Sequence, residues 1–115
     1  MAIQRGEIYF VDLDPTVGRE QAGVRPCVVV SSNKINAKPL VVTIILGTKG
    51  SNVPHDFTSN VRVPADASGL PEETVFMAFQ IRAVDHRRFP RSPSGRLPDE
   101  YMQQLEIALR YCCEL

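Results

Sequence analysis

Two polar side chains lie at the ends of two apolar runs and are the main candidates for chemistry. Arg25 precedes a short β-branched run over residues 26–31, and Thr48 follows a second run over residues 40–46. Both runs have the composition of strands that are buried on two faces. The ends of rigid strands are good mounts for functional groups. If the two strands pair, Arg25 and Thr48 converge on one anion such as a phosphate.

The charges are unevenly distributed, although 13 basic and 13 acidic residues cancel. Residues 21–55 contain no acid, and residues 82–96 contain five arginines against Asp85 alone. The acids gather near the two ends of the chain. Two basic stretches on a neutral chain can form a basic face that follows phosphates. The alternative is a set of scattered, solvated cations.

Other catalytic arrangements have weaker support in this sequence. It has no glycine-rich phosphate loop, no G-x-S-x-G turn, no His-x-x-x-His pair and no C-x-x-C pair. A two-histidine ribonuclease needs His55, in a loop, and His86 to act together, whereas loop histidines are usually just exposed. A metal site from Asp12, Asp14 and Glu20 is conceivable, but acids at a strand end are more often solvent-facing caps. We expect no metal and no cofactor.

The three cysteines do not suggest a metal or disulfide framework. Cys27 lies in an apolar run, and Cys112 and Cys113 are adjacent. The number is odd and the spacing is not that of a metal site. We interpret them as reduced core or interface residues, with redox control of the adjacent pair as a minor alternative.

Length and composition predict one ordinary globular domain over residues 1–115. The chain is 43% hydrophobic and 23% charged, which favours neither disorder nor a fibrous repeat. No apolar run approaches the roughly 18–20 residues that cross a bilayer, and the N-terminal residues lack the apolar stretch of a signal peptide. We therefore predict a cytoplasmic protein without a membrane segment.

The elements that must position these side chains are mostly short strands. Strand patterns cover residues 7–13, 26–31, 40–46 and 58–63, and residues 74–84 fit one bent strand or two consecutive ones. Ser32 or Asn33 can cap a helical turn before Pro39 stops it. Residues 49–56 carry turn residues without periodicity, which indicates a mobile loop. Such short strands between Gly and Pro punctuation predict a small antiparallel barrel.

The end of the chain has helical character. Residues 97–100, Leu-Pro-Asp-Glu, are typical of a helix start, with proline and two acids in the first turn. Apolar side chains then recur at three- and four-residue spacing: Tyr101, Met102, Leu105, Ala108, Leu109 and Cys112. This periodicity predicts an amphipathic helix laid on the barrel.

Two motifs near the N-terminus, with others downstream, resemble the MazF/PemK toxins. Residues 5–21 read RGEIYFVDLDPTVGREQ, and residues 24–31 read VRPCVVVS. The resemblance continues through Ser-Gly-Leu at 68–70, QIRAVD at 80–85, Arg88, and Gly-Arg-Leu at 95–97. It covers nearly the whole chain, with order and spacing kept.

The resemblance implies an SH3-like antiparallel barrel, of the CcdB/MazF type, with a C-terminal helix. It implies a homodimer, a cognate antitoxin protein as partner, and sequence-specific, metal-independent cleavage of single-stranded RNA that stops translation and growth. The family's catalytic arginine and threonine fall on Arg25 and Thr48, and a glutamate implicated in some members falls on Glu20. Gln80 and Arg82 fall near the family's RNA groove and dimer surface.

The resemblance and the charge pattern together give the expected RNA contacts, Lys34, Lys49, Gln80, Arg82 and Arg88. Thr48 is the less secure assignment, because Gly47 stands where many relatives have proline. Arginine is a poor general base, since its pKa exceeds about 12, so Glu20 is the candidate base. Arg25 before Pro26 has a bland alternative, in which it pairs with Glu20 or Asp14 and only holds a loop.

Two rival functions remain compatible with the sequence. A toxin that resembles the CcdB gyrase poisons acts without catalysis, by binding a protein through its terminal helix. A catalytically inactive RNA-binding or antitoxin-sequestering module is the other alternative. The gyrase poison predicts that Arg25→Ala is harmless, and the inactive module predicts RNA binding without cleavage.

Overall fold

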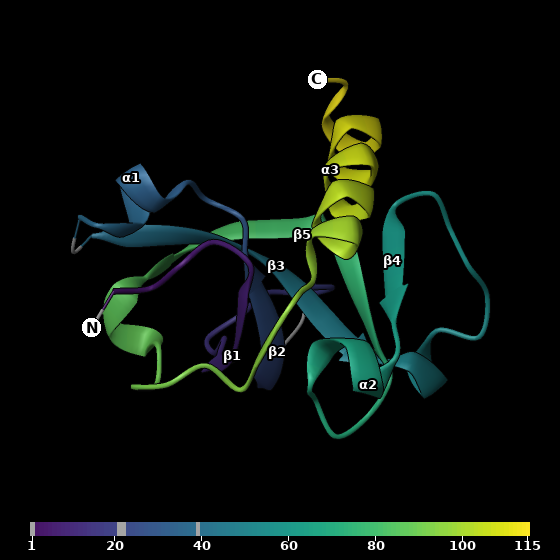
Figure 1. Cartoon of the computed structure of the whole chain (residues 1–115), viewed down its shortest axis with the longest axis horizontal. Helices are drawn as coiled ribbons and strands as arrows, with labels where there is room; N and C mark the ends of the chain where they lie inside the picture. The colour runs from purple at the N-terminus through teal and green to yellow at the C-terminus, as the bar shows by residue number, and fades with distance from the viewer. Residues whose placement is uncertain (1, 21–22, 39) are drawn as a thin grey trace.

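Six antiparallel strands form one curled sheet. The structure, a computed structural model, describes residues 2–20, 23–38 and 40–115. The strands are Glu7–Asp12 (β1), Val24–Val29 (β2), Val41–Lys49 (β3), Asn60–Val63 (β4), Thr74–Asp85 (β5) and Gly95–Arg96 (β6). The sheet order is β4-β5-β3-β2-β1-β6, so β4 and β6 are its edges. The sheet curls into a half-barrel (Figure 1).

Five helical segments connect or cover the strands in the described part of the chain. They are Asn33–Asn36 (α1), Gly50–Asn52 (η1), Ala65–Ser68 (α2), His86–Arg88 (η2) and Asp99–Cys113 (α3). Helix α3 lies against β4 and β5 (Figure 1). Its first turn carries Asp99 and Glu100, and its last turn carries Arg110, which suits the helix dipole at both ends. Within the described ranges, no helix has the length and apolarity to cross a membrane.

The core has two parts because successive side chains on the inner strands point to opposite faces. Ile8 and Val28 pack with the apolar face of α3, through residues such as Leu105. Tyr9 and Cys27, one residue along from each, belong to a second cluster on the other face. Strands β1, β2 and β3 therefore contribute buried side chains on both faces. For β2 and β3, the continuous apolar runs predicted this.

Several predicted elements are confirmed. The C-terminal helix covers residues 99–113, and Ser32 caps α1, because its side chain accepts a hydrogen bond from the Ile35 backbone N–H. Pro39, predicted to stop that turn, lies outside the described residues.

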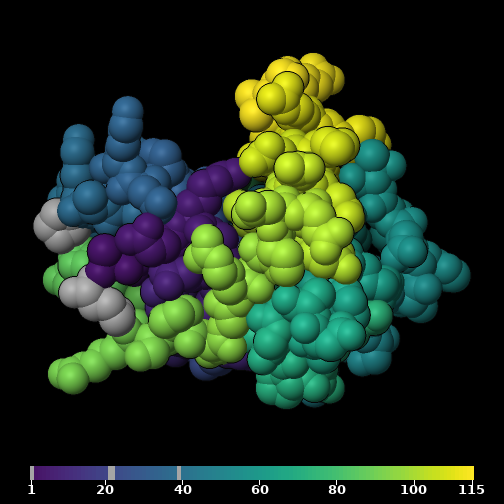
Figure 2. All heavy atoms as spheres, viewed as in Figure 1, coloured from purple at the N-terminus to yellow at the C-terminus, as the bar shows by residue number. Residues whose placement is uncertain are grey.

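In the space-filling view, the N-terminal segment (purple) lies between the α1 segment (blue) and α3 (yellow) (Figure 2).

Near the candidate site, the boundaries of β2 and β3 differ from prediction. Strand β2 begins at Val24 and not at residue 26, and β3 continues to Lys49, past the end of the apolar run at residue 46. Hydrogen bonding to β5 extends β3, since Thr48 pairs with Val75 and Lys49 with Thr74. Thr48 therefore lies inside a strand, where its backbone is held on a ladder, and not beyond its end.

Strand β5 is the single bent strand of the two predicted alternatives. Its register against β3 shifts between two consecutive residues of β3: Ile45 pairs with Ile81, but Leu46 pairs with Met77. The extra residues of β5 form a bulge, which bends a strand and increases its local twist. This bend helps to curl the sheet around the end of β3.

Gly47 is required where β3 crosses this bend. A Cβ atom there would lie 2.9 Å from Cγ2 of Thr74 and 3.0 Å from two ring atoms of Phe76. Those distances are shorter than ordinary van der Waals contact, so a larger side chain must displace β5. Close packing against Thr74 and Phe76 thus explains why this chain has glycine at position 47.

We expect Gly47→Ala to lower the free energy of unfolding by roughly 1–3 kcal/mol, the usual range for overpacking a core. Urea denaturation followed by circular dichroism measures this change. Thr74→Ser removes Cγ2 and keeps the hydroxyl that donates to the Glu72 carbonyl. The combination of both changes should recover part of the loss. Equal losses in the single and double variants would show that the clash is not with Thr74.

Candidate active site

The pairing of β2 with β3 brings Arg25 and Thr48 together. Cys27 lies opposite Leu46 in this antiparallel ladder, so two residues further along Arg25 lies opposite Thr48. Arg25 Nη1 donates to Thr48 Oγ1 at 3.4 Å. This distance is long for an N–H···O hydrogen bond, whose usual range ends near 3.2 Å, so the guanidinium is in contact with the hydroxyl without being tightly bound to it. The predicted convergence of the two side chains is present.

Asn52 is a third member of this cluster. Its Nδ2 donates to Thr48 Oγ1 at 3.0 Å. A threonine hydroxyl has two acceptor lone pairs and one hydrogen. Because Arg25 and Asn52 both donate to Oγ1, the hydroxyl hydrogen is directed to another acceptor. Thr48 is thus arranged as a hydrogen-bond donor beside the guanidinium.

Sequence analysis missed Asn52. It lies in the Gly-Ser-Asn turn of η1, directly after β3, and asparagine in a turn ordinarily indicates only a turn. The signal that Asn52 contacts Thr48 is the four-residue spacing between them. That spacing brings two side chains together only where the chain is helical.

A cavity of about 140 Å³ surrounds Arg25 and Thr48. Apolar groups form part of its wall, and Lys49, Glu72 and the catalytic candidates add charged and polar groups. Thr48 is 5% exposed. Walls of low polarizability strengthen the attraction between Arg25 and an anion. The lining consists of Phe10, Val24, Arg25, Pro26, Thr48, Lys49, Leu70, Pro71, Glu72 and Thr74.

A family model decides what kind of protein carries this site. The model, described as a PemK-like, MazF-like toxin of type II toxin-antitoxin systems, matches residues 4–112. The chain belongs to this family. The resemblance seen in the sequence motifs is therefore confirmed over nearly its full length.

Relatives of similar length support the same assignment. The MazF-like chain is 32% identical over 113 residues to Endoribonuclease EndoA of Bacillus subtilis, which covers 96% of this chain and 93% of the relative. It is 36% identical over 118 residues to Endoribonuclease MazF9 of Mycobacterium tuberculosis, with 98% of each chain covered. MazF of Deinococcus radiodurans has the same fold, with a TM-score of 0.84 at 20% identity over 100% of this chain and 99% of that one.

Of the predicted RNA contacts, Lys49 is the one that lines the cavity. Its Nζ lies 3.7 Å from an oxygen of Glu72, and both side chains are more than half exposed. Exposed pairs of this kind contribute little, about 0–1 kcal/mol, so Lys49 can exchange this partner for an anion. Among the described residues, Glu72 is also the only carboxylate in the cavity lining.

Other predicted site residues of the MazF-like chain lie away from this cavity. Glu20 is exposed, and its Oε1 accepts a hydrogen bond from the Val17 backbone N–H. Lys34 lies on α1, near the start of β3, whereas Thr48 lies near its end. Arg88 donates from Nη1 to the carbonyls of Asp12 and Asp14, at 3.1 and 3.0 Å. The contacts of Glu20 and Arg88 were not predicted from the sequence.

Gln80 and Arg82 are half-buried on β5. Arg82 pairs with Ile44, which places it on the same face of the sheet as Leu46 and Thr48. Its positive charge acts on the buried thiol of Cys27, a residue of β2. Arg82 is therefore on the same face of the sheet as Thr48, while Gln80 lies in the bulge.

The two histidines are separate. His55 is exposed in the β3–β4 connection, whereas His86 Nδ1 lies 3.1 Å from the Leu40 carbonyl and 3.5 Å from Asp85. In the parts of the chain that the structure describes, no three His, Cys, Asp or Glu side chains are grouped to hold a metal ion. Asp12 and Asp14 instead accept backbone hydrogen bonds from Asp14 and Gly23.

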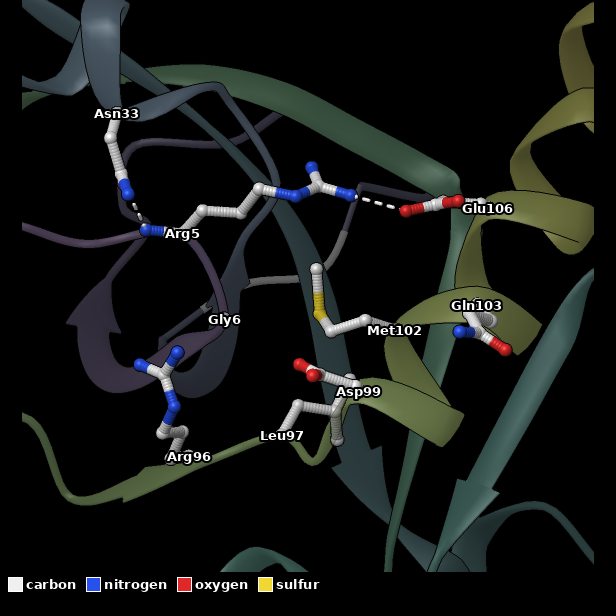
Figure 3. Close-up of a pocket in the computed structure, with 9 residues that line it drawn as sticks. All are labelled: Arg5, Gly6, Asn33, Arg96, Leu97, Asp99, Met102, Gln103 and Glu106. Carbon is white, nitrogen blue, oxygen red and sulfur yellow. Dashed lines mark hydrogen bonds and ion pairs between the residues drawn. The ribbon is translucent and has the colours of Figure 1, made fainter.

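A second cavity, of about 340 Å³, lies between the N-terminal segment and α3 (Figure 3). Arg5 spans it, because its backbone N–H donates to Asn33 at 2.7 Å and its Nη2 pairs with Glu106 at 2.7 Å. Arg96 and Asp99 complete the charged lining. Two cations and two acids balance there, so this cavity has no net charge to select a phosphate.

The Cys27 thiol is buried beneath the site, and this burial controls its reactivity. Burial raises the pKa of Cys27 to about 12, although the charge of Arg82 opposes the rise. The thiolate is the reactive form, so at pH 8 only about one Cys27 in 10,000 is ionised.

We expect iodoacetamide to modify exposed Cys113 while Cys27 stays unmodified until the protein unfolds. Peptide mass spectrometry measures this, and equal rates for the two residues would contradict the burial.

Proposed function

We propose that this chain is an endoribonuclease toxin that cleaves single-stranded RNA sequence-specifically and without a metal ion. The observation that carries the proposal is the contact between Arg25 and Thr48 inside a partly apolar cavity. Two relatives at 32% and 36% identity are named endoribonucleases. Cleavage of RNA by such a toxin inhibits translation and growth. Because its substrate is cellular RNA, we place its action in the cytoplasm.

The proposed reaction uses a nucleophile that RNA itself supplies. The 2′-oxygen attacks the adjacent phosphorus and loses its proton, and the bond from phosphorus to the 5′-oxygen breaks. The leaving 5′-oxygen gains a proton. The products are a 2′,3′-cyclic phosphate and a 5′-OH end, so atoms and charge balance without an external reagent.

Arg25 and Thr48 are assigned to the phosphate. The Arg25 guanidinium offers parallel donors and a permanent charge, which stabilise the extra negative charge of the pentacoordinate transition state. Because Arg25 and Asn52 both donate to Thr48 Oγ1, the hydroxyl hydrogen of Thr48 is available for the substrate. It donates to a phosphate oxygen or to the 2′-oxygen. We place the RNA backbone along Lys49, Gln80 and Arg82, with Lys34 and Arg88 as more distant contacts.

The assembly proposed for this chain is a homodimer inhibited by a cognate antitoxin. Solved relatives include an endoribonuclease of a mycobacterial species in complex with its cognate antitoxin, and MazE-MazF of Deinococcus radiodurans. An antitoxin with an acidic, extended or helical segment would compete with RNA for the cations beside the cavity.

We expect the purified protein to cut single-stranded RNA in EDTA and to leave 5′-OH ends. Arg25→Ala should lower kcat/KM by about 10²–10³-fold, the usual loss for one transition-state donor. Thr48→Val, which keeps the side-chain shape, should lower it in the same direction. Cleavage of a fluorogenic RNA oligonucleotide measures both effects.

Arg110→Ala is the matched control, because it removes an exposed cation on α3 away from the cavity. It should leave cleavage unchanged. Intact RNA with the wild-type protein in EDTA would overturn the proposal and leave an RNA-binding module. An Arg25→Ala variant that still arrests growth would favour a non-enzymatic, gyrase-poison type of toxin.

Two carboxylates compete for the role of proton acceptor. Glu20 comes from the sequence, but its Oε1 is bonded to the Val17 backbone N–H; Glu72 lines the cavity. We expect Glu72→Gln to lower kcat/KM in the fluorogenic RNA assay far more than Glu20→Gln does, because a glutamine cannot accept the proton. The reverse result would assign the base to Glu20.

A further inference from the structure

Arg62, on β4, binds the connection between β3 and β4 at several points. Its Nε donates to Asp56 Oδ1 at 2.9 Å, and its Nη1 donates to the Gly50 carbonyl at 3.2 Å and to Glu73 Oε1 at 2.9 Å. Its Nη2 donates to the Val53 carbonyl. One rigid, planar guanidinium therefore holds three points of residues 50–57, called here the 50–57 loop, and one point on the approach to β5.

The strand register explains why Arg62 lies under this loop. Val75 pairs with Thr48 on one side and with Arg62 on the other. Residues directly opposite each other share a face of the sheet, so Thr48, Val75 and Arg62 form one row across three strands. Strand spacing puts the two outer residues roughly 10 Å apart. The 50–57 loop spans that distance, because it joins β3 to β4, and its later part runs alongside β4 (Figure 1).

The loop is held on both sides of Asn52. Before it, the Gly50 N–H donates to the Glu73 carbonyl at 2.9 Å, and the Gly50 carbonyl accepts from Arg62 Nη1. After it, the Val53 carbonyl accepts from Arg62. A Cβ atom at Gly50 would lie 2.1 Å from Glu73 Oε1, so the turn packs closely on the residue that Arg62 also binds.

We infer that Arg62 is a positioning residue for the cleavage site: it fixes the 50–57 loop so that Asn52 holds the Thr48 hydroxyl in its donating orientation. This inference rests on the proposed function, since it concerns the same reaction. Arg62 itself does not line the cavity around Arg25 and Thr48. Its effect reaches the phosphate through Asn52 and Thr48.

The charges around Arg62 argue against a direct role in binding phosphate. Asp56 and Glu73 both pair with it at 2.9 Å, and their hydrogen bonds raise the pKa of Arg62 above its ordinary value. Two carboxylates more than balance one guanidinium. A phosphate would therefore meet no surplus positive charge, and loss of Arg62 should act on the chemical step more than on RNA binding.

The first test is a split between kcat and KM. We expect Arg62→Gln to lower kcat by about tenfold to a hundredfold, because small misplacements of catalytic groups cost this much, with a much smaller rise in KM. Arg62→Lys should recover part of kcat, since an ammonium has donors but not the planar fork. Glu106→Gln, which breaks the Arg5–Glu106 pair at the second cavity, is the control and should leave kcat unchanged.

A double-mutant cycle tests whether Arg62 acts through Asn52. Asn52→Ala alone should lower kcat, and Arg62→Gln added to it should cost little more. Asn52→Asp should be worse than Asn52→Ala, because a carboxylate would accept the Thr48 hydrogen that the phosphate needs. Independent, multiplying losses for Arg62 and Asn52 would overturn the inference. So would a loss confined to KM, which would mean that Arg62 acts only through its charge.

A measurement without RNA separates this inference from the proposed function. Hydrogen exchange of the Gly50 and Val53 amides, and the NMR signal of the Asn52 side-chain amide, should report a loosened loop in Arg62→Gln. If that variant fails to fold, Asp56→Asn, which removes one partner of Arg62 at an exposed residue, should loosen it in the same direction. An unchanged loop overturns the inference even if the wild type cuts RNA. If the loop is loosened in Arg62→Gln but the wild-type protein cuts no RNA, the role of Arg62 in holding the loop is supported and only the proposed function is contradicted.

Discussion

The pairing register of β2 with β3 is the constraint on which the site depends. Both strands are buried on two faces, so a slip of one residue would exchange every side chain between the two clusters. That penalty fixes Cys27 opposite Leu46, and the same ladder then places Arg25 beside Thr48. The core thus determines the geometry of the polar pair, although neither residue contributes to the apolar clusters.

Many cations of this chain are engaged in holding its own segments. Arg5 joins the N-terminal segment to α3, Arg62 holds the 50–57 loop, and Arg88 binds carbonyls at the end of β1. A count of basic residues therefore overstates the surface available to RNA. Of the described cations, Arg25 and Lys49 line the cavity, and Arg82 lies on the same face of the sheet as Thr48.

Sequence patterns predicted the elements well where one local rule acts alone. The helix at 99–113 follows from its start signal and from the spacing of Met102 and Leu105, and the Ser32 cap follows from side-chain chemistry. Prediction was weaker where pairing between distant strands sets the bounds of an element. Strand β3 extends to Lys49 because β5 offers partners beyond the apolar run, and the 49–56 segment, read as a mobile loop, contains η1 and is bound by Arg62.

The sequence by itself determined the family and the antiparallel architecture, and it predicted Arg25 and Thr48 as the main candidate site residues, because motifs and apolar runs are local and keep their spacing along the chain. The tertiary structure decided which polar groups meet. Asn52 reaches Thr48, Glu72 enters the cavity, and Glu20 bonds within its own loop. These outcomes depend on bends, bulges and long-range ladders, which combine residues far apart in the chain and leave no periodic trace in the sequence.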